Sequence, residues 1–260
     1  MQWETRKVLV TVKAYPEKST KYGETVCVAG VTEGGDFIRL YPVHFNYFRG
    51  TNPIKKYTWI EVECKKNTSE KLQRKESYKI RDGTGIKIVS QELTKQPVNW
   101  VARNKILKHL VCDSIETLKD KFKEDKTSIG LIKVKDLLEF YSREPIDEIE
   151  LEESKFVQAS IFGGGKTPLQ QIPHTFRYKF NCSDVCTGHD MNVEDWEVFE
   201  SFRSWLRYYK GDCQVLWDKL KQRYETEMRN KDLHFFMGTD SQWGIWMIIG
   251  LYYPPATCPL

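Results

Sequence analysis

Apolar and polar side chains alternate in short runs along the first 65 residues. In Lys7–Lys13, the three valines at positions 8, 10 and 12 lie on one face of an extended chain. A period of two is typical of a half-buried strand. Four such runs are separated by turn signals such as Gly34-Gly35-Asp36: Lys7–Lys13, Thr25–Val31, Phe37–Val43 and Tyr57–Lys65. Short strands in a lysine-rich sequence predict a small β-barrel or curled sheet of the OB, SH3-like or PUA-like kind.

After Pro97 the pattern becomes helical, with one apolar stripe at Val101, Ile106, Leu107 and Leu110 and a second amphipathic piece at Ile115–Phe122. Strand and helix patterns then mix as far as Phe162. The stretch FGGGKTPLQQIP at 162–173 contains three glycines and two prolines and is typical of a hinge.

The last part of the chain predicts one further strand and two long helices before a closing pair of strands. The final run is apolar on both faces, which predicts a central buried strand. The expected elements are a strand at 174–181, helices at 193–209 and 213–229, and strands at 233–239 and 245–253. The fold class is therefore α+β: a basic, β-rich portion at 1–162 and a mixed α/β portion at 163–260, as two domains or one continuous domain.

Composition favours an ordinary globular protein, with 40% hydrophobic and 29% charged residues. The amino-terminal residues lack the apolar core of a signal peptide, and no stretch is long enough to span a membrane, so we expect a cytoplasmic protein. The seven cysteines are an odd number and mostly isolated, a pattern that suits reduced thiols better than a disulfide framework.

Charge is distributed unevenly. Residues 1–110 carry 21 Lys/Arg and 11 Asp/Glu, a balance of +10, whereas the whole chain has a net charge of only +4. A basic portion of this kind is compatible with a polyanion, so DNA is the expected partner and RNA an alternative. Lysines placed for solubility are the other explanation.

Aromatic and basic residues gather on the predicted strands. Phe37, Arg39 and Tyr41 are two apart and share a face, and Tyr57 and Trp59 repeat the pattern on another strand. An exposed face of this composition can stack bases and neutralise phosphates. Alternatively, the rings cover a core under a helix at 98–111. The predicted nucleic-acid-binding residues are Phe37, Arg39, Tyr41, Arg49, Lys55, Lys56, Tyr57 and Trp59.

Cys182, Cys186 and His189 fall within eight positions. Thiolate and imidazole both suit the tetrahedral coordination of zinc, but the set is one ligand short. Either a distant group such as Cys213 or His234 completes a structural site, or a water molecule leaves the metal open for chemistry. The alternative is two packed thiols beside a turn histidine.

Carboxylates follow this turn. Asn192 can act as a helix N-cap with Asp195 three residues later, as in a capping box, so we expect Asp195 and Glu197 to be structural. Glu63 and Lys65 form an E-x-K pattern similar to that of metal-dependent nucleases.

The segments GETVCVAGVTEGGDFIRLYPV, CTGHDMNVEDWE, LHFFMGT and IIGLYYPP resemble those of an uncharacterised group of small prokaryotic proteins associated with phage-defence loci. The resemblance implies foreign nucleic acid as the target. One activity of that setting fits the residues: excision of a modified base from DNA, which requires no cofactor and uses a carboxylate against the oxocarbenium charge.

The expected acids are Asp36, Asp190 and Asp240, with His189 as helper. We interpret the chain as a DNA-directed hydrolase, base excision being the most specific version. The alternatives are a non-catalytic DNA- or RNA-binding module with a structural zinc turn, and a metal-dependent nuclease. No small-molecule cofactor motif is evident.

Overall fold

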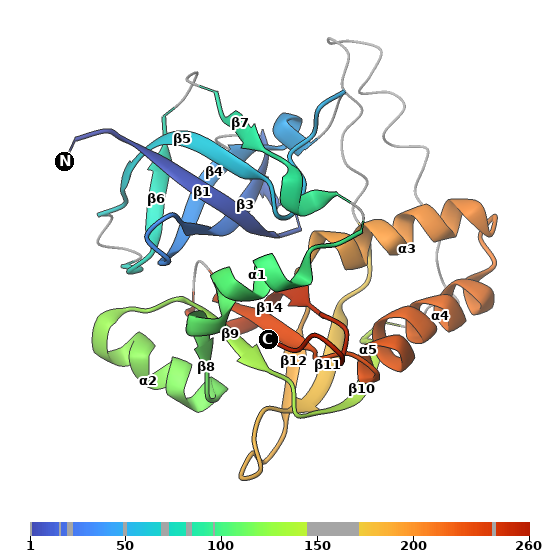
Figure 1. Ribbon diagram of the computed structural model, residues 1–260. Coiled ribbons are helices and arrows are strands. Elements are labelled where there is room, and N and C mark those ends of the chain that lie inside the picture. Colours follow the sequence, from blue (N-terminus) through green and yellow to red (C-terminus); the bar gives the residue numbers. More distant parts are fainter. Residues whose placement is uncertain are drawn as a thin grey trace.

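The computed structural model shows a β-barrel above a carboxy-terminal assembly of sheets and helices (Figure 1). It describes residues 2–15, 17–19, 23–48, 51–68, 73–81, 85–95, 97–144, 172–240 and 243–260. The predicted boundary between residues 162 and 163, and the predicted hinge up to residue 171, lie outside the described residues.

Five strands close the barrel, because the first strand pairs with both β3 and β5. Around the barrel the strands are β1 (Glu4–Lys13), β3 (Gly23–Thr32), β4 (Phe37–His44), β6 (Ser77–Ile80) and β5 (Trp59–Lys66). The pairing of β4 with β6 is parallel and the others are antiparallel. Two short strands add to it: β2 (Glu17–Ser19) pairs with β3, and β7 (Lys87–Ser90) pairs with β5. The predicted α+β class with an amino-terminal barrel is confirmed.

Alternation along the strands divides apolar side chains between the barrel interior and the surface that faces the carboxy-terminal part. Val8 and Val10 of β1 point into the barrel, whereas Leu9 packs outside it. The prediction that Val12 shares the face of Val8 is wrong, because a bulge between Val10 and Val12 shifts the register and turns Val12 outward with Leu9.

Two sheets form the carboxy-terminal part. One has the order β14 (Trp246–Tyr252), β13 (His234–Thr239), β9 (Ile129–Lys133) and β8 (Val111–Cys112); the other is β10 (Asp136–Ser142), β11 (Phe176–Asn181) and β12 (His189–Asn192).

The prediction that the last strand is central in its sheet is wrong, because β14 is an edge strand. It is nevertheless buried on both faces: Ile248 joins the core under the helices, and Ile249 joins the core against the barrel.

The helices are α1 (Trp100–Leu107), α2 (Ile115–Asp125), α3 (Trp196–Tyr208), α4 (Cys213–Lys221) and α5 (Glu227–Arg229). Short 3-10 turns lie at Phe45–Phe48, Glu92–Thr94 and Lys108–Leu110. The predicted helix at 213–229 is interrupted by a π-helical turn at Gln222–Thr226. None of the helices in the described part of the chain is long and apolar enough to cross a membrane.

The N-cap of α3 is Asp195, whose carboxylate accepts from the Glu197 amide. The prediction of Asn192 as the cap is wrong, because Asn192 still belongs to β12, where its side chain accepts a hydrogen bond from Arg177.

Candidate functional site

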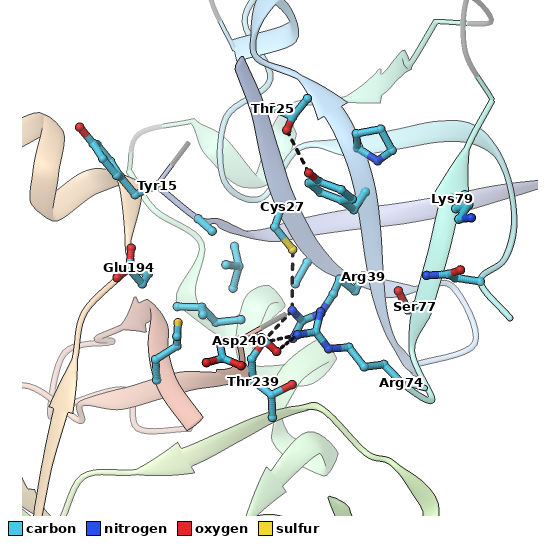
Figure 2. Close-up of a pocket in the computed structure, with 18 residues that line it drawn as sticks. Tyr15, Thr25, Cys27, Arg39, Arg74, Ser77, Lys79, Glu194, Thr239 and Asp240 are labelled. Atoms are coloured by element: carbon cyan, nitrogen blue, oxygen red, sulfur yellow. Dashed lines mark hydrogen bonds between the residues drawn. The ribbon is translucent and has the colours of Figure 1, made fainter. Parts of the chain in front are cut away.

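A cavity of about 380 Å³ lies between the outer face of the barrel and the edge of the carboxy-terminal sheet. We call it the arginine pocket. Strands β3, β4 and β6 supply one wall, and β13 and β14 supply another (Figure 2). Its polar lining consists of Thr25, Arg39, Tyr41, Asn67, Arg74, Ser77, Lys79, Glu194, Thr239 and Asp240.

Two arginines meet at the floor of the pocket, where their guanidinium groups lie side by side in Figure 2. Arg39 donates from Nη1 to the Thr239 carbonyl at 3.2 Å and from Nη2 to the Ser128 carbonyl at 3.0 Å. Arg74 donates from Nη2 to the same Thr239 carbonyl at 2.8 Å. The Thr239 carbonyl of β13 therefore accepts hydrogen bonds from both guanidinium groups, which joins this strand to Arg39 of the barrel and to the loop of Arg74.

Neither guanidinium forms an ion pair with a carboxylate of the described residues. The nearby Glu76 carboxylate instead accepts from the amide and hydroxyl of Ser128. Arg39 is 4% exposed and Arg74 is 8% exposed, so both charges are held largely out of water. Burial, reinforced by the charge of Arg39, lowers the pKa of Arg74 to about 10.

Three buried polar atoms in this pocket have no hydrogen-bond partner among the described residues: Arg39 Nε, Arg74 Nε and Thr239 Oγ1. Buried polar groups are normally satisfied, and an unsatisfied one costs about 1–3 kcal/mol. Two cationic donors and a hydroxyl, each itself buried, therefore have unused hydrogen-bonding capacity beside one cavity.

Gly238 permits this arrangement. A Cβ atom there would lie 2.7 Å from Ile249 Cδ1 and 3.1 Å from Arg39 Nη2. A larger side chain would push the guanidinium away from β13, so the glycine allows Arg39 to reach the Thr239 carbonyl.

The pocket also contains an aromatic ring and two further charged groups. Tyr41 is 37% exposed and accepts a hydrogen bond from Thr25 at 3.3 Å. Lys79 is exposed, and Asp240 lines the pocket while its Oδ1 accepts from the amides of Trp243 and Gly244.

The predicted binding face is only partly exposed. Arg39 and Tyr41 share a face and line the pocket, as their spacing predicts. The expectation that Arg39 lies on an open platform is wrong, because β13 covers it.

The alternative prediction, that the rings cover a core under a helix, describes the other three aromatic residues. The core between the barrel and α1 contains Phe37, Tyr57 and Trp59. Tyr57 is 7% exposed and its ring stacks against Arg103, with 3.7 Å between the guanidinium carbon and the ring centre. Tyr57 is buried, and Phe37 and Trp59 are partly buried in a cluster that also contains Trp100 and Leu107, so the three rings do not form the predicted open stacking face.

The predicted basic residues also differ in accessibility. Lys55 is exposed. Arg49 lies outside the described residues. The expectation of an accessible Lys56 is wrong: it is 6% exposed and faces the start of α3.

Lys56, Asp195 and Glu197 form a compact group that we call the lysine cluster. Lys56 Nζ lies 2.8 Å from Asp195 Oδ2 and 3.1 Å from Glu197 Oε2. Burial alone would lower the pKa of Lys56, but the two carboxylates raise it well above its usual value. Asp195 also accepts from the Leu251 amide at 2.8 Å, so the cluster joins the barrel, α3 and β14. The structural role expected for the two carboxylates agrees with these contacts.

The predicted catalytic residues do not converge. Only Asp240 lines the arginine pocket. Asp36 is exposed in a turn and lines a separate groove with Lys75 and His109. Asp190 is bound by Arg177 at 2.8 Å and by the Tyr141 hydroxyl at 2.7 Å.

His189 lies instead beside the two cysteines, and Cys182, Cys186 and His189 offer ligand atoms within 4.8 Å of one another. We call them the cysteine–histidine cluster. The His189 Nε2 atom is 3.3 Å from Cys182 Sγ, and the Gly188 amide donates to Cys186 Sγ at 3.4 Å. Burial lowers the pKa of His189, which favours the neutral imidazole.

Neither distant group expected to complete this set belongs to it within the described part of the chain. The Cys213 thiol donates to the Gly211 carbonyl, and His234 Nδ1 contacts the Asp232 carbonyl at 2.9 Å. A carboxylate also lies beside the cluster: Glu116 on α2, whose Oε1 lies 3.7 Å from His189 Nε2.

The E-x-K pattern does not form a metal site within the described residues. Glu63 pairs with Arg81, and Lys65 lies over the Trp3 ring with 4.7 Å to its centre.

Sequence reasoning missed Arg74 and Glu116. Arg74 lies outside every predicted strand, in a loop before β6, and the only available signal was its basic charge. Glu116 is hidden because a carboxylate in a first helical turn has an ordinary structural explanation.

Two protein-family models match the chain. A model described as Domain of unknown function (DUF8758) matches residues 4–109, and one described as Domain of unknown function (DUF8757) matches residues 111–259. A comparison with curated proteins finds no match.

Among solved structures, one titled "Structure of murine DNA binding protein bound with ds DNA" aligns with 98% of this chain and 95% of that chain. The two are 11% identical with a TM-score of 0.33, which is too low to indicate a shared fold. The second family match spans more than half of the 260 residues, and the chain therefore belongs to the DUF8757 family.

Proposed function

We propose that this protein binds DNA and holds one nucleotide of it in the arginine pocket. The observation that carries the proposal is the pair of buried guanidinium groups, Arg39 and Arg74, which line a cavity without a carboxylate partner among the described residues.

A buried cation is costly unless an opposite charge or several acceptors compensate for it. Carbonyl oxygens supply part of that compensation. The two Nε atoms have no hydrogen-bond partner among the described residues, and acceptor atoms of a ligand would supply the rest. Nucleotides carry such acceptors on phosphate and on base edges, and arginine is the side chain that most often contacts both.

The size and rim of the cavity agree with this ligand. Small-molecule sites usually have volumes of about 300–1,000 Å³, and the pocket of about 380 Å³ lies in that range. The exposed Lys79 and the Tyr41 ring can contact the strand that enters. The excess positive charge of residues 1–110 supports a polyanionic partner.

Base excision is the more specific form of the proposal. It requires a carboxylate beside an extruded nucleotide, and Asp240 is the one of the four predicted catalytic residues that lines the pocket. A role in defence against foreign DNA rests on the sequence resemblance and belongs to the same proposal.

Binding is tested by fluorescence anisotropy with labelled single- and double-stranded DNA at several salt concentrations. We expect Lys79→Gln and Tyr41→Ala to weaken binding by about 1–3 kcal/mol, and Lys79→Gln to reduce the salt slope by about one. Lys219→Gln on α4 removes an equal charge from an exposed site outside the pocket and should leave affinity unchanged. Equal affinities in all three variants would contradict the assignment of the pocket.

Chemistry is tested by incubating the protein with modified and unmodified DNA and measuring alkali-labile abasic sites in the presence of chelator. Asp240→Asn keeps the acceptor oxygen that receives the Trp243 and Gly244 amides, so the fold is retained while the charge is lost. Abasic sites made by the wild type and lost in this variant support base excision. Binding without product leaves a DNA-binding module, and chelator-sensitive strand breaks would indicate a nuclease.

We also infer that the cysteine–histidine cluster binds zinc. The ligand set is the one zinc prefers, and the Cys182–His189 separation of 3.3 Å is close to the ~3.6 Å expected between sulfur and nitrogen on a tetrahedral zinc ion. The Gly188 amide directed at Cys186 Sγ is the kind of outer contact that orients a bound thiolate.

A further inference from the structure

We propose that Glu116 is the fourth ligand of the zinc ion inferred for the cysteine–histidine cluster. The proposal rests on that zinc and deepens it: four protein ligands make a closed, structural site, whereas three would leave a position open for water.

The distances from the carboxylate to two of the other ligands fit one coordination sphere. Glu116 Oε1 lies 3.7 Å from His189 Nε2, and Oε2 lies 3.9 Å from Cys182 Sγ. Ligand atoms on a tetrahedral zinc ion are separated by about 3.3–3.7 Å, given bonds of 2.0–2.3 Å. Neither carboxylate oxygen lies within 4.8 Å of all three other ligand atoms, so coordination requires the Glu116 side chain, which is 57% exposed, to rotate toward Cys186.

The fold brings Glu116 to this place from a different part of the chain. Ser114 caps α2 by accepting from the Thr117 amide, which sets Glu116 in the first turn of that helix. The cysteines and histidine come from the turn between β11 and β12. Zinc bound by all four groups would tie the amino-terminal end of α2 to this hairpin across 66 residues of sequence.

The carboxylate is available for this role. Its other ion pair within the described residues is with Lys119, at 4.0 Å, and both side chains are about half exposed. Surface pairs of this kind contribute little free energy, so coordination can replace the pair without a large cost. His189 is better enclosed, with 7% of its side chain exposed, and gives the site a buried side.

A closed set has a chemical consequence. Catalytic zinc keeps one position for water or substrate, whereas this set fills all four. The ion would stabilise the link between hairpin and helix, and the nucleotide chemistry proposed for the arginine pocket would proceed in chelator.

The test measures zinc content and affinity of the full-length protein, together with the visible spectrum after substitution by Co²⁺. The variants are Glu116→Gln, Glu116→Cys and Cys186→Ser, with Glu124→Gln as the matched control on the same helix. Thermal unfolding with and without chelator provides a second readout.

We expect one zinc per wild-type chain, a lower melting temperature in chelator, and loss of the ion in Cys186→Ser. Glu116→Gln should weaken zinc affinity about 100-fold or more, since even outer contacts to a zinc ligand contribute 10–100-fold. Glu116→Cys should restore affinity and increase the sulfur-to-cobalt charge-transfer absorption, because a third thiolate joins the ion. Glu124→Gln should match the wild type.

The two proposals fail separately. Wild-type protein without zinc, at protein and zinc concentrations above those needed for a structural site, overturns both. One zinc per chain with the same affinity and the same cobalt spectrum in wild type and Glu116→Gln overturns the assignment of Glu116 and leaves the three-ligand zinc site with an open position.

Discussion

The lysine cluster and the arginine pocket are two buried charge groups that connect the barrel to the carboxy-terminal part. In the lysine cluster, one ammonium is held by two carboxylates at 2.8 and 3.1 Å. In the arginine pocket, two guanidinium groups share a backbone carbonyl and have no carboxylate partner among the described residues. The first group is complete within the protein and the second is not.

This difference separates a structural charge from one that, under the proposed function, is available to a ligand. A buried ion pair that satisfies itself contributes to the specificity of packing. A buried cation pair without a carboxylate in ion-pair contact is retained at a cost in stability, which is a common property of functional sites. Burial alone would not have distinguished them, since Lys56 and Arg39 are almost equally inaccessible at 6% and 4%.

The largest expected effect is on the lysine cluster. Asp195→Ala leaves the Lys56 charge and the Leu251 amide without their acceptor, so we expect a loss of about 3–5 kcal/mol in the free energy of unfolding. Urea denaturation measures it. Asp212→Ala removes the exposed N-cap of α4 and should cost only about 1 kcal/mol. Equal losses in the two variants would mean that Asp195 contributes no more to stability than an exposed helix cap.

The arginine pocket should respond in the opposite way. Arg74→Gln removes one unpaired cation, so we expect DNA binding to weaken by about 1.5–3 kcal/mol while the free energy of unfolding changes by about 1 kcal/mol or less. Anisotropy and urea denaturation on the same preparation check both parts. Arg207→Gln on α3 is the charge-matched control at an exposed site. A stability loss as large as that of Asp195→Ala would show that Arg74 is structural.

Gly238→Ala tests the close approach of β13 to the pocket. The added methyl group would crowd Ile249 and the Arg39 guanidinium, so we expect a loss of about 1–2 kcal/mol in the free energy of unfolding together with weaker DNA binding. Gly211→Ala serves as a control for backbone freedom, because a Cβ atom there would contact nothing within 4 Å, although its φ of +82° adds local strain. If Gly238→Ala binds DNA with the affinity of the wild type, the position of the Arg39 guanidinium does not determine DNA binding.

The smallest effect concerns the pH dependence of stability. Lys56 and Arg74 keep their charges between pH 5.5 and 6.5, so this dependence tests two buried histidines instead of the two charge groups. Burial lowers the pKa of His174 and His234 below 6.5, more than Glu144 and Asp232 raise it. The unfolded chain therefore binds protons first as the pH falls through 6.5. We expect stability to be highest above this pH and to fall below it by at most about 1.4 kcal/mol per pH unit for each histidine.

Unfolding at pH 7.5, 6.5 and 5.5 measures this slope. His234→Gln should make the slope shallower, whereas His109→Gln, at an exposed position, should leave it unchanged. A steeper slope in His234→Gln would reverse the assigned sign.

Local pattern predicted the elements whose signal is repeated over several residues. The runs at 25–31 and 37–43 became β3 and β4, and the run at 193–209 became α3 with its start moved to Trp196. Elements with few residues or a weak pattern, such as β6 and β8, were not predicted, because a strand of two to four residues carries almost no periodicity.

The sites divide in the same way. The cysteine–histidine cluster could be predicted because its three ligands are close in sequence and a turn brings them together. The arginine pocket could not, since Arg39, Arg74 and Thr239 are up to 200 residues apart. Spacing along β4 predicted that Arg39 and Tyr41 share a face, but it does not state what covers that face.

The sequence by itself determined the α+β class, four of the five barrel strands and the local group of two cysteines and a histidine, because these features depend on residues that are close in sequence. Only the tertiary structure decided that Lys56 forms ion pairs with carboxylates, whereas Arg39 and Arg74 form none with the described residues. Whether a buried charge finds a partner depends on which distant segments pack against it, and that contact is absent from any local pattern.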